Sequence, residues 1–527
     1  MVGVEGRTLS CFLEDAAMRH FAALVPLVAL VVAVPAAVGA QEAEPAYDRK
    51  TDNITFVGHE QFVQGTDMFF QRRDGRQHLD GEVIDGVRDF LFAGADASGA
   101  VGSPPGGEFV GVKIFDVTDP TAPIELAAIA CGGYHADVQV YENYLIQSID
   151  SAGTNTGCTP EFDPDGVDRA EVSGIRVLDI EDPANPAVAA FVTAETLENS
   201  VHNMTTLPWA GLLYVAGSSF AEGDPGNLTI VDLKDPTFPA KVIAMEAISQ
   251  TAQAECHDIG VAQLEDQALA FCAAVHETFI WDVTDPMNPT HVSSVPLAVE
   301  SIHHAARVAP DGTTLVLNDE LGGAAAAPGC LATTQDPIGA LWFYDISDPA
   351  LPILEGTFST AELAEKMPCT SHFYNFIPGT TLLTVGWYKS GMLVVDYGGL
   401  PQTSEHAVFT PTGGSFWSSY YWHGYVYGNS FGGGGLYGGT DDMGGVWITQ
   451  LEGVGDVEPS PHDEGTSWAR WTSQLPPASP PSDEPDPAPE VGADDQSNLP
   501  TTGGGLAAAA LAALGVVALT RRRRKLA

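Results

Sequence analysis

One short unit constrains the fold of this chain more than any other feature: an apolar run, an Asp, and a second Asp followed by Pro. Its clearest copy is VKIFDVTDPTAP at residues 112–123. Four related copies and two weaker ones follow, the last of which, VWITQL from residue 446, lacks the Asp. The first Asp recurs every 50 to 63 residues, at Asp116, Asp179, Asp232, Asp282, Asp345 and Asp396. Repeats at this spacing indicate a propeller, a solenoid or an array.

Each copy predicts a buried β-strand followed by a tight corner. The apolar and β-branched run is too short for a helix. The Asp-Pro pair ends it, because proline fixes φ and has no N–H for the next ladder bond. We expect the first Asp to form hydrogen bonds at the corner and the second Asp to belong to the turn. No amphipathic helical periodicity lies between the copies, which argues against a parallel βα fold.

Two further strand-like runs precede each copy and a fourth follows it, as at 135–140, 144–149 and 123–129. Four short antiparallel strands in about fifty residues are typical of a propeller blade. We therefore predict an all-β fold, a seven-bladed β-propeller over residues 41–452. A strand at 53–57 would supply the missing outer strand of the last blade and close the ring. Six or eight blades remain alternatives.

The repeated units resemble LVIVD repeats, which occur in secreted bacterial β-propellers with varied membrane or wall anchors. The resemblance extends over about residues 53–451. It implies the propeller fold and is almost silent on activity, because propellers host many chemistries.

The first forty residues, 1–40, read as a secretory signal peptide. A short basic front at Arg19 and His20 precedes the apolar core at 21–34, and small residues end the segment at 38–40. Met18 is a better start than Met1, because the acidic residues between them suit a signal poorly. A retained membrane anchor is the alternative.

The C-terminus resembles a sortase sorting signal of Gram-positive bacteria. An LPxTG motif precedes the apolar stretch 506–519, for which we expect a short helix, and the basic residues 521–525. The motif consists of Leu499, Pro500, Thr501, Thr502 and Gly503. The resemblance implies that sortase joins Thr502 to peptidoglycan and that the protein lies at the cell wall, with membrane contact only through the uncleaved 499–527 segment. A plain C-terminal membrane anchor is the alternative.

Residues 453–498 are expected to form a disordered linker, because a segment rich in Pro, Asp and Glu cannot bury enough apolar surface to fold. The whole chain is strongly acidic, with a formal net charge of −47. Such a charge repels nucleic acid and anionic lipid. The protein is therefore not expected to bind nucleic acid.

The mature chain would contain six cysteines, an even number that favours disulfides in an exported protein. Cys256 and Cys272 fall on successive strands and could face each other. Cys131 and Cys158 flank the first two strands of the second blade. This leaves Cys330 with Cys369. Other pairings of the six remain open.

Five histidines open the first strands of blades two to six: His135, His202, His257, His304 and His372. First strands line the channel of a propeller, and Glu320 ends a second strand that could approach the same place. Imidazole and carboxylate together suit Zn, Cu, Fe or Mn. His257, His304 and His372 with Glu320 are the first candidates for a divalent metal site. The alternatives are histidines that only join blades, being too widely spaced for one ion, and a pH-sensitive channel. His303 should point the other way.

A second candidate cation site lies in an insertion of blade two. Asp163, Asp165 and Asp168 surround a glycine turn and resemble a calcium loop without the full spacing. An ordinary acidic turn is the alternative.

Together these features predict an exported, wall-anchored propeller that binds or displays an unidentified extracellular ligand. The second hypothesis is an extracellular metal-dependent enzyme, a hydrolase or an oxidoreductase, with a histidine-lined site in the channel. A purely structural wall spacer is a third. The sequence identifies no catalytic residue, ligand or reaction.

Overall fold

The fold is taken from a computed structural model. The structure describes residues 44–62, 64–95, 111–132, 135–150, 173–197, 200–217, 228–237, 239–245, 256–264, 266–296, 302–320, 339–360, 370–432, 443–457 and 468–470. The chain divides into two units, 1–475 and 476–527, and all of the described residues belong to the first. The expected signal peptide at 1–40 with Met18, the sorting motif at 499–503 and the apolar stretch 506–519 therefore lie outside the described residues.

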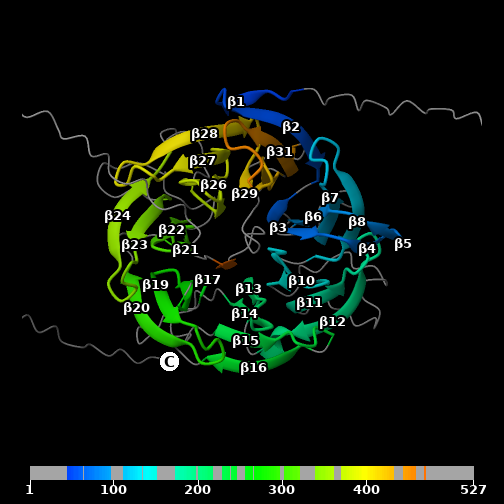
Figure 1. Ribbon diagram of the computed structural model, residues 1–527, viewed down its shortest axis with the longest axis horizontal. Helices are drawn as coiled ribbons and strands as arrows, with labels where there is room; N and C mark the ends of the chain where they lie inside the picture. The colour runs from blue at the N-terminus through cyan, green and yellow to red at the C-terminus, as the bar shows by residue number, and fades with distance from the viewer. Residues whose placement is uncertain are drawn as a thin grey trace, which may run out of the picture. The chain divides into compact units, whose positions relative to one another are not determined.

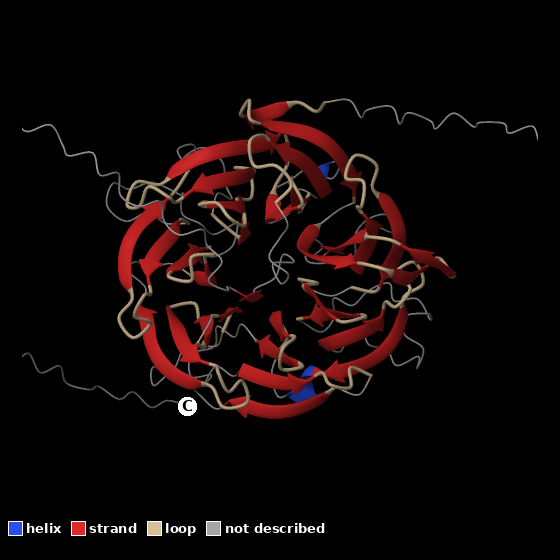
Figure 2. Ribbon diagram, in the orientation of Figure 1, coloured by secondary structure: helices blue, strands red, loops and turns tan. Residues whose placement is uncertain are grey.

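The first unit is an all-β propeller (Figures 1 and 2). Four of its sheets contain four antiparallel strands in chain order along the sheet. The first two consist of β3 (Gly65–Arg73), β6 (Arg88–Ala95), β7 (Gly111–Asp116) and β8 (Ile124–Ala130), and of β9 (Val138–Tyr141), β10 (Tyr144–Ile149), β11 (Gly174–Asp179) and β12 (Ala187–Thr193). The next two consist of β13 (Asn203–Leu207), β14 (Leu212–Ala216), β15 (Leu228–Asp232) and β16 (Ala240–Met245), and of β21 (His303–Val308), β22 (Thr314–Asp319), β23 (Leu341–Asp345) and β24 (Ile353–Phe358).

Two sheets have additional strands. One contains β17 (Asp258–Gln263), β18 (Ala268–Ala273), β19 (Glu277–Asp282) and β20 (Thr290–Pro296), with β32 (Trp468–Arg470) beside β17. The other has nine strands: β1 (Tyr47–Lys50), β28 (Ser404–Pro411), β27 (Met392–Asp396), β26 (Leu382–Gly386), β25 (Phe373–Phe376), β29 (Phe416–Trp422), β30 (Tyr425–Ser430), β31 (Gly445–Leu451) and β2 (Ile54–Gln61). The hairpin β4 (Arg76–Leu79) and β5 (Glu82–Asp85) stands apart, and the helix α1 (Ala194–Leu197) is the one helix among the described residues.

The sheets follow one another around a ring, with strands such as β3, β13, β17, β21 and β29 innermost (Figure 1). Neighbouring innermost strands contact each other, as β9 does β3 and β13, and as β17 does β13 and β21. Large apolar side chains such as Trp281, Trp387 and Trp447 are buried in the sheets and between them. The ring therefore holds together through apolar burial, and its inner strands surround the centre of the ring.

The repeated corner is built as the sequence predicts. The first Asp of every copy accepts a hydrogen bond from the backbone N–H two residues later, at 2.8 to 3.0 Å. The second Asp does the same from the residue after proline, at 3.0 to 3.2 Å. Two side-chain turns in series thus fix each corner. The strand before each corner also carries a register shift opposite its fourth strand, for example between Ile280 and Trp281.

Strands from the two ends of the propeller close the ring. β2 pairs antiparallel with β31, from Ile54 opposite Leu451 to Gln61 opposite Gly445. The N-terminal strand predicted from the sequence therefore serves as the outer strand of the last sheet. A second N-terminal strand, β1, adds to the outer edge of β28 and was not predicted.

The structure describes two parts of the expected linker, and both contact the propeller. In the first, 453–457, the Gly455 carbonyl oxygen accepts a hydrogen bond from the Tyr421 hydroxyl at 2.9 Å. Residues 468–470 form β32, which pairs parallel with β17, with Val261 opposite Trp468 and Gln263 opposite Arg470. Because β17 is an innermost strand, this segment enters the channel (Figure 1). In the described part of the chain, no helix is long and apolar enough to cross a membrane.

Candidate metal centre

The five histidines predicted to line the channel meet in a circle of tilted and edge-on rings. Successive ring centroids from His135 through His202, His257 and His304 to His372 lie 4.2, 4.1, 4.4 and 4.1 Å apart. The indole of Trp417 completes the circle, 4.3 Å from His372 and 5.2 Å from His135. None of the five histidines is more than 7% exposed. We call these six side chains the aromatic circle.

The circle forms because each of its histidines lies at or near the start of an inner strand. His202, His257 and His372 directly precede β13, β17 and β25. His304 is the second residue of β21, and His135 lies shortly before β9. One strand start per sheet thus delivers one imidazole to the same end of the channel. Their rings are in contact, so spacing does not prevent several of them from sharing an ion.

Three carboxylates adjoin the circle: Asp258 and Glu320 are buried, and Asp150 is 15% exposed. Asp150 Oδ2 lies 3.0 Å from His202 Nδ1, and Asp258 Oδ2 lies 3.0 Å from His304 Nδ1. Glu320 Oε2 is 3.6 Å from His304 Nε2, and Glu320 Oε1 is 3.7 Å from His372 Nε2. Within the described ranges, both carboxylate oxygens of Asp258 are buried without a hydrogen bond of good geometry. Such an orphaned group indicates a missing partner.

These side chains form three sets in which the ligand atoms all lie within 4.8 Å of one another. The sets are His135, Asp150 and His202; His202, His257 and Asp258; and His257, His304 and Glu320. Imidazole nitrogen and carboxylate oxygen bind zinc and related ions at about 2.0–2.2 Å, so each set is compact enough to surround one ion. The predicted His372 is not in these sets, although it contacts Glu320.

Hydrogen bonds orient two of these groups for metal binding. His372 Nδ1 lies 2.9 Å from the carbonyl oxygen of Trp417. Because a carbonyl only accepts, Nδ1 carries the proton, which leaves Nε2 with its lone pair toward Glu320. The Tyr388 hydroxyl donates to Glu320 Oε1 at 2.5 Å. His303, as expected, makes its contact elsewhere, with Thr278 Oγ1 at 2.9 Å.

Burial favours the uncharged forms of most acids and bases in the site. It raises the pKa of Glu320 to about 8 and that of Asp258 to about 7. Burial, with repulsion from neighbouring imidazoles, holds the pKa values of four circle histidines well below their usual range: His135, His257, His304 and His372. Burial also lowers the pKa of His202, but the carboxylates of Asp150, Asp258 and Glu320 together outweigh it and the net shift is upward. A divalent cation would stabilise the ionised carboxylates and bind the neutral imidazoles.

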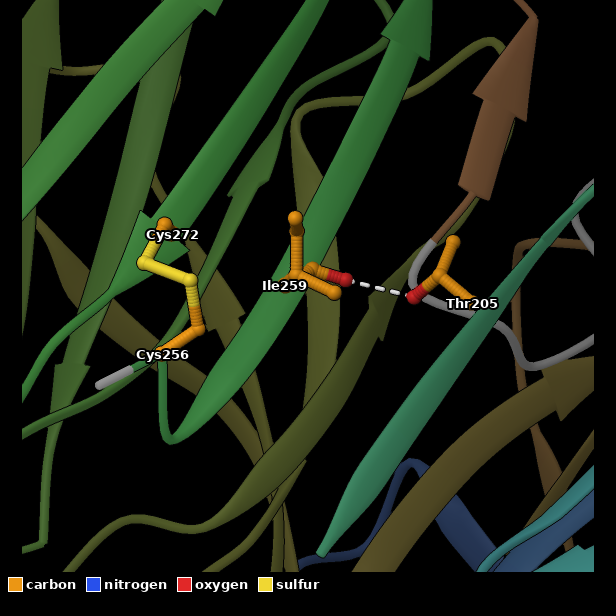
Figure 3. The surroundings of a disulfide bond; sticks show 4 residues. All are labelled: Thr205, Cys256, Ile259 and Cys272. Atoms are coloured by element: carbon orange, nitrogen blue, oxygen red, sulfur yellow. Dashed lines mark hydrogen bonds between the residues drawn. A yellow bond between two sulfur atoms is a disulfide. The ribbon is translucent and has the colours of Figure 1, made fainter. Parts of the chain in front are cut away.

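A disulfide and an interstrand hydrogen bond hold the start of β17 in place (Figure 3). Cys256 and Cys272 are bonded, which fixes the residue before His257 to the neighbouring strand β18. The Thr205 hydroxyl on β13 donates to the carbonyl oxygen of Ile259 at 2.5 Å. The backbone on both sides of His257 and Asp258 is thereby attached to a neighbouring strand.

The other cysteines expected in disulfides are only partly described. Cys131 is disulfide-bonded, and its expected partner Cys158 lies outside the described residues. Cys330 and Cys369 are outside them too, as are Asp163, Asp165 and Asp168 of the expected calcium loop.

The backbone is strained beside the circle. His135 and Ala136 have φ values of 72° and 50°, and Tyr388 has 40°. Side chains other than glycine rarely occupy this left-handed region, and such residues gather at functional sites. The strain therefore coincides with a ring histidine and with the tyrosine that binds Glu320.

Three residues of the site were not predicted: Asp150, Tyr388 and Trp417. Asp150 directly follows the second strand of its sheet, as Glu320 does, so the rule that found Glu320 would have found it. Trp417 takes the place of a histidine at the start of β29. Nothing in the sequence around Tyr388 indicates its contact with Glu320.

A second polar layer surrounds the buried Arg307 of β21. Its guanidinium donates to the Tyr374 carbonyl oxygen and lies 5.3 Å from the Tyr374 ring centre and 5.8 Å from that of Tyr420. The Tyr420 hydroxyl donates to Asp67 Oδ1 at 2.6 Å. Asp137, also buried, accepts from Asn203 Nδ2 at 3.2 Å. Among the described residues, neither Asp67 nor Asp137 belongs to a candidate metal set, in contrast to Asp258.

Comparison with known proteins supports the repeat. The LVIVD repeat matches residues 339–360, which contain β23, its Asp-Pro corner and β24. A search of curated proteins finds no match to this chain.

Solved structures that resemble it include the β-propeller domain of Cps50 (Swd1) from Myceliophteria thermophila, with 11% identity, TM-score 0.43, and coverage of 74% of this chain and 98% of that one. A periplasmic gluconolactonase from Pseudomonas aeruginosa is similar at 11% identity, TM-score 0.43, and 64% and 85% coverage. A protein from Lactobacillus plantarum is similar at 9% identity, TM-score 0.44, and 69% and 88% coverage.

Proposed function

We propose that this chain is an extracellular metal-dependent hydrolase whose active site is the histidine-lined end of the propeller channel. The observation that carries the proposal is the meeting of five buried imidazoles with two buried carboxylates, Asp258 and Glu320, and the partly buried Asp150. The first ion would bind His257, His304 and Glu320, with His372 held toward Glu320 by its bond to the Trp417 carbonyl. This donor set, without thiolate, suits Zn²⁺ and similar divalent ions.

The arrangement supports hydrolysis because a bound divalent ion lowers the pKa of water to near neutrality. Asp258 adjoins His257 and His304, and burial raises its pKa to about 7. A carboxylate that titrates near the working pH is suited to accept the proton of the attacking water. We assign Asp258 as the general base.

Elemental analysis of the purified protein tests the metal. We expect at least one equivalent of a transition metal. A chelator should remove this metal and thereby abolish the hydrolysis of ester and phosphate-ester substrates. His304→Ala and the milder Glu320→Gln should lose this metal. His303→Ala is the matched control, because its side chain contacts Thr278 outside the aromatic circle. Metal-free wild-type protein that cannot take up Zn²⁺, or hydrolysis unaffected by the chelator, would overturn the proposal.

The finer architecture and location belong to the same proposal. If the nine-stranded sheet counts as two blades with β1 added at its edge, the ring has seven blades. Export through residues 1–40 and covalent attachment through Thr502 would place the propeller at the wall of a Gram-positive cell, with sortase and peptidoglycan as partners. Mass spectrometry of wall fragments should find the chain ending at Thr502 and joined to a peptidoglycan peptide. An intact tail in that fraction would contradict the anchoring.

A second candidate function is binding or adhesion at the cell surface. Leu351, Ile353 and Leu354 expose 68%, 61% and 46% of their surface at the start of β24. Exposed apolar residues that lie together mark interaction sites. A glycan and peptide array should detect binding that Ile353→Asp abolishes. Array binding unchanged by this substitution would remove the support that this patch gives to adhesion.

A further inference from the structure

We propose that the aromatic circle holds two metal ions, with the second bound by His135, Asp150 and His202. The inference deepens the proposed function, on which it rests for the first ion. It concerns residues that the first ion does not need.

The two ligand sets share no residue. His135, Asp150 and His202 form one, and His257, His304 and Glu320 form the other. In each set the ligand atoms lie within 4.8 Å of one another, so occupying one set takes no ligand from the other. Asp150 Oδ2 and His202 Nδ1 touch at 3.0 Å, and an ion between them would replace that contact.

The two sets are neighbours along the circle. The rings of His202 and His257, one from each set, have centroids 4.1 Å apart. His202 and His257 also form a compact group with Asp258, which therefore lies where the sets meet. Protein sites that use two ions for hydrolysis hold them about 3.5–4 Å apart. Because the two sets adjoin, we place the two ions close enough to reach one water molecule.

The charge balance favours two ions over one. Asp150, Asp258 and Glu320 bring up to three negative charges into a site whose other ligands are imidazoles. With all three ionised, one divalent ion would leave one negative charge uncompensated, and an unpaired charge in a largely buried site is costly. Two divalent ions with one hydroxide between them give a neutral site.

Independent support comes from the backbone of the second set. His135 has a φ of 72° and Ala136 a φ of 50°. Strain of this kind persists where the position of a side chain matters. His135 is no ligand of the first ion, so the first ion alone does not account for the strain at this position.

Zn²⁺ titration of the metal-stripped full-length chain tests the inference. Calorimetry and equilibrium dialysis should give two equivalents for the wild type. Asp150→Asn and Glu320→Gln keep the shape of the side chain and should each reduce the count to one, with affinity at the altered set falling by about 100-fold or more. His303→Ala should retain two equivalents, and circular dichroism checks that every variant folds.

Cobalt substitution gives a second readout. Two Co²⁺ ions in contact should show magnetic coupling that disappears in Asp150→Asn. One Zn²⁺ equivalent that is lost in Glu320→Gln and kept in Asp150→Asn would overturn the two-ion inference and leave the proposed function standing. Absence of any Zn²⁺ binding to the folded wild type would overturn both.

Discussion

In Glu320, the free-energy cost of burying a charge opposes the ionisation that metal binding requires. It is buried between His304, His372 and Tyr388, and burial raises its pKa from 4.5 to about 8. Below pH 4.5 the carboxyl is protonated in both the folded and the unfolded chain. Between pH 4.5 and 8 the unfolded chain releases this proton while the folded chain keeps it. The contribution of Glu320 to stability therefore falls as the pH rises through that window.

Glu320→Gln should consequently stabilise the metal-stripped protein at pH 7.5. We expect its melting temperature to rise by about 2 to 5 °C, with the gain vanishing near pH 4.5. In saturating Zn²⁺ the order should invert, because the wild type then gains more from the ion. Circular dichroism melts at both pH values measure this. The exposed Glu355→Gln is the control, and a Glu320→Gln protein less stable without metal at pH 7.5 would refute the argument.

Tyr388 tunes the same carboxyl. Its hydroxyl donates to Glu320 and lowers the Glu320 pKa, against the larger effect of burial. Tyr388→Phe should therefore raise this pKa further. Because binding of an ion must displace the proton, the affinity for Zn²⁺ at pH 7 should fall and recover at higher pH. A Zn²⁺ titration from pH 6 to 9 checks this, and a pH-independent loss would instead indicate a structural defect.

At the scale of elements, the disulfide beside β17 supports the metal centre. The bond between Cys256 and Cys272 holds the residue before His257 against β18. Replacing both cysteines by serine should loosen the start of β17 and weaken Zn²⁺ binding by about tenfold or more, as expected when a positioning contact is lost. Isothermal titration measures the loss, with far-UV circular dichroism as the check on folding. Unchanged affinity would show that Thr205 alone keeps Ile259 and its strand in place.

The sequence revealed those elements whose signal is local. The apolar run with its Asp-Pro corner predicted the third strand of each repeated unit, and the corner hydrogen bonds of Asp116 and Asp282 follow from it. β1 and β32 were not predicted, because a short strand is added to an open sheet edge through backbone hydrogen bonds, which require no hydrophobic pattern.

In the site, too, the residues with a local signal in the sequence were the ones that could be predicted. The histidines were found because each opens an inner strand, and Glu320 because it ends a second strand. The distances between them could not be predicted, since they depend on how closely the ring brings the inner strands together. Trp417 was missed as a member of the circle because it lies at the start of β29, in the part of the nine-stranded sheet where the repeat has decayed and no histidine opens the strand.

For the molecule as a whole, the pairing of β2 with β31 is the closure of the ring. Ile54 and Phe56 are buried against the last sheet, at 0% and 7% exposure. A chain shortened to begin at residue 62 should leave β31 as an open edge, bind the dye ANS and melt at least about 10 °C lower, because it loses an entire strand with its core contacts. A chain that begins at residue 51 removes β1 alone and is the control. Equal melting of the two truncated chains would contradict this role of β2.

The same pairing joins one of the first strands to be synthesised with one of the last. Ile54 can pair only after Leu451 has been synthesised, so nearly the whole propeller must exist before β2 has its partner strand. Contacts this distant along the chain form slowly and leave apolar surface open in the meantime. A polypeptide that stops after β28 has no place for β2. Sealing of the ring thus reports that translation passed β31, and a product terminated before that strand would remain recognisable to proteases by its open edge.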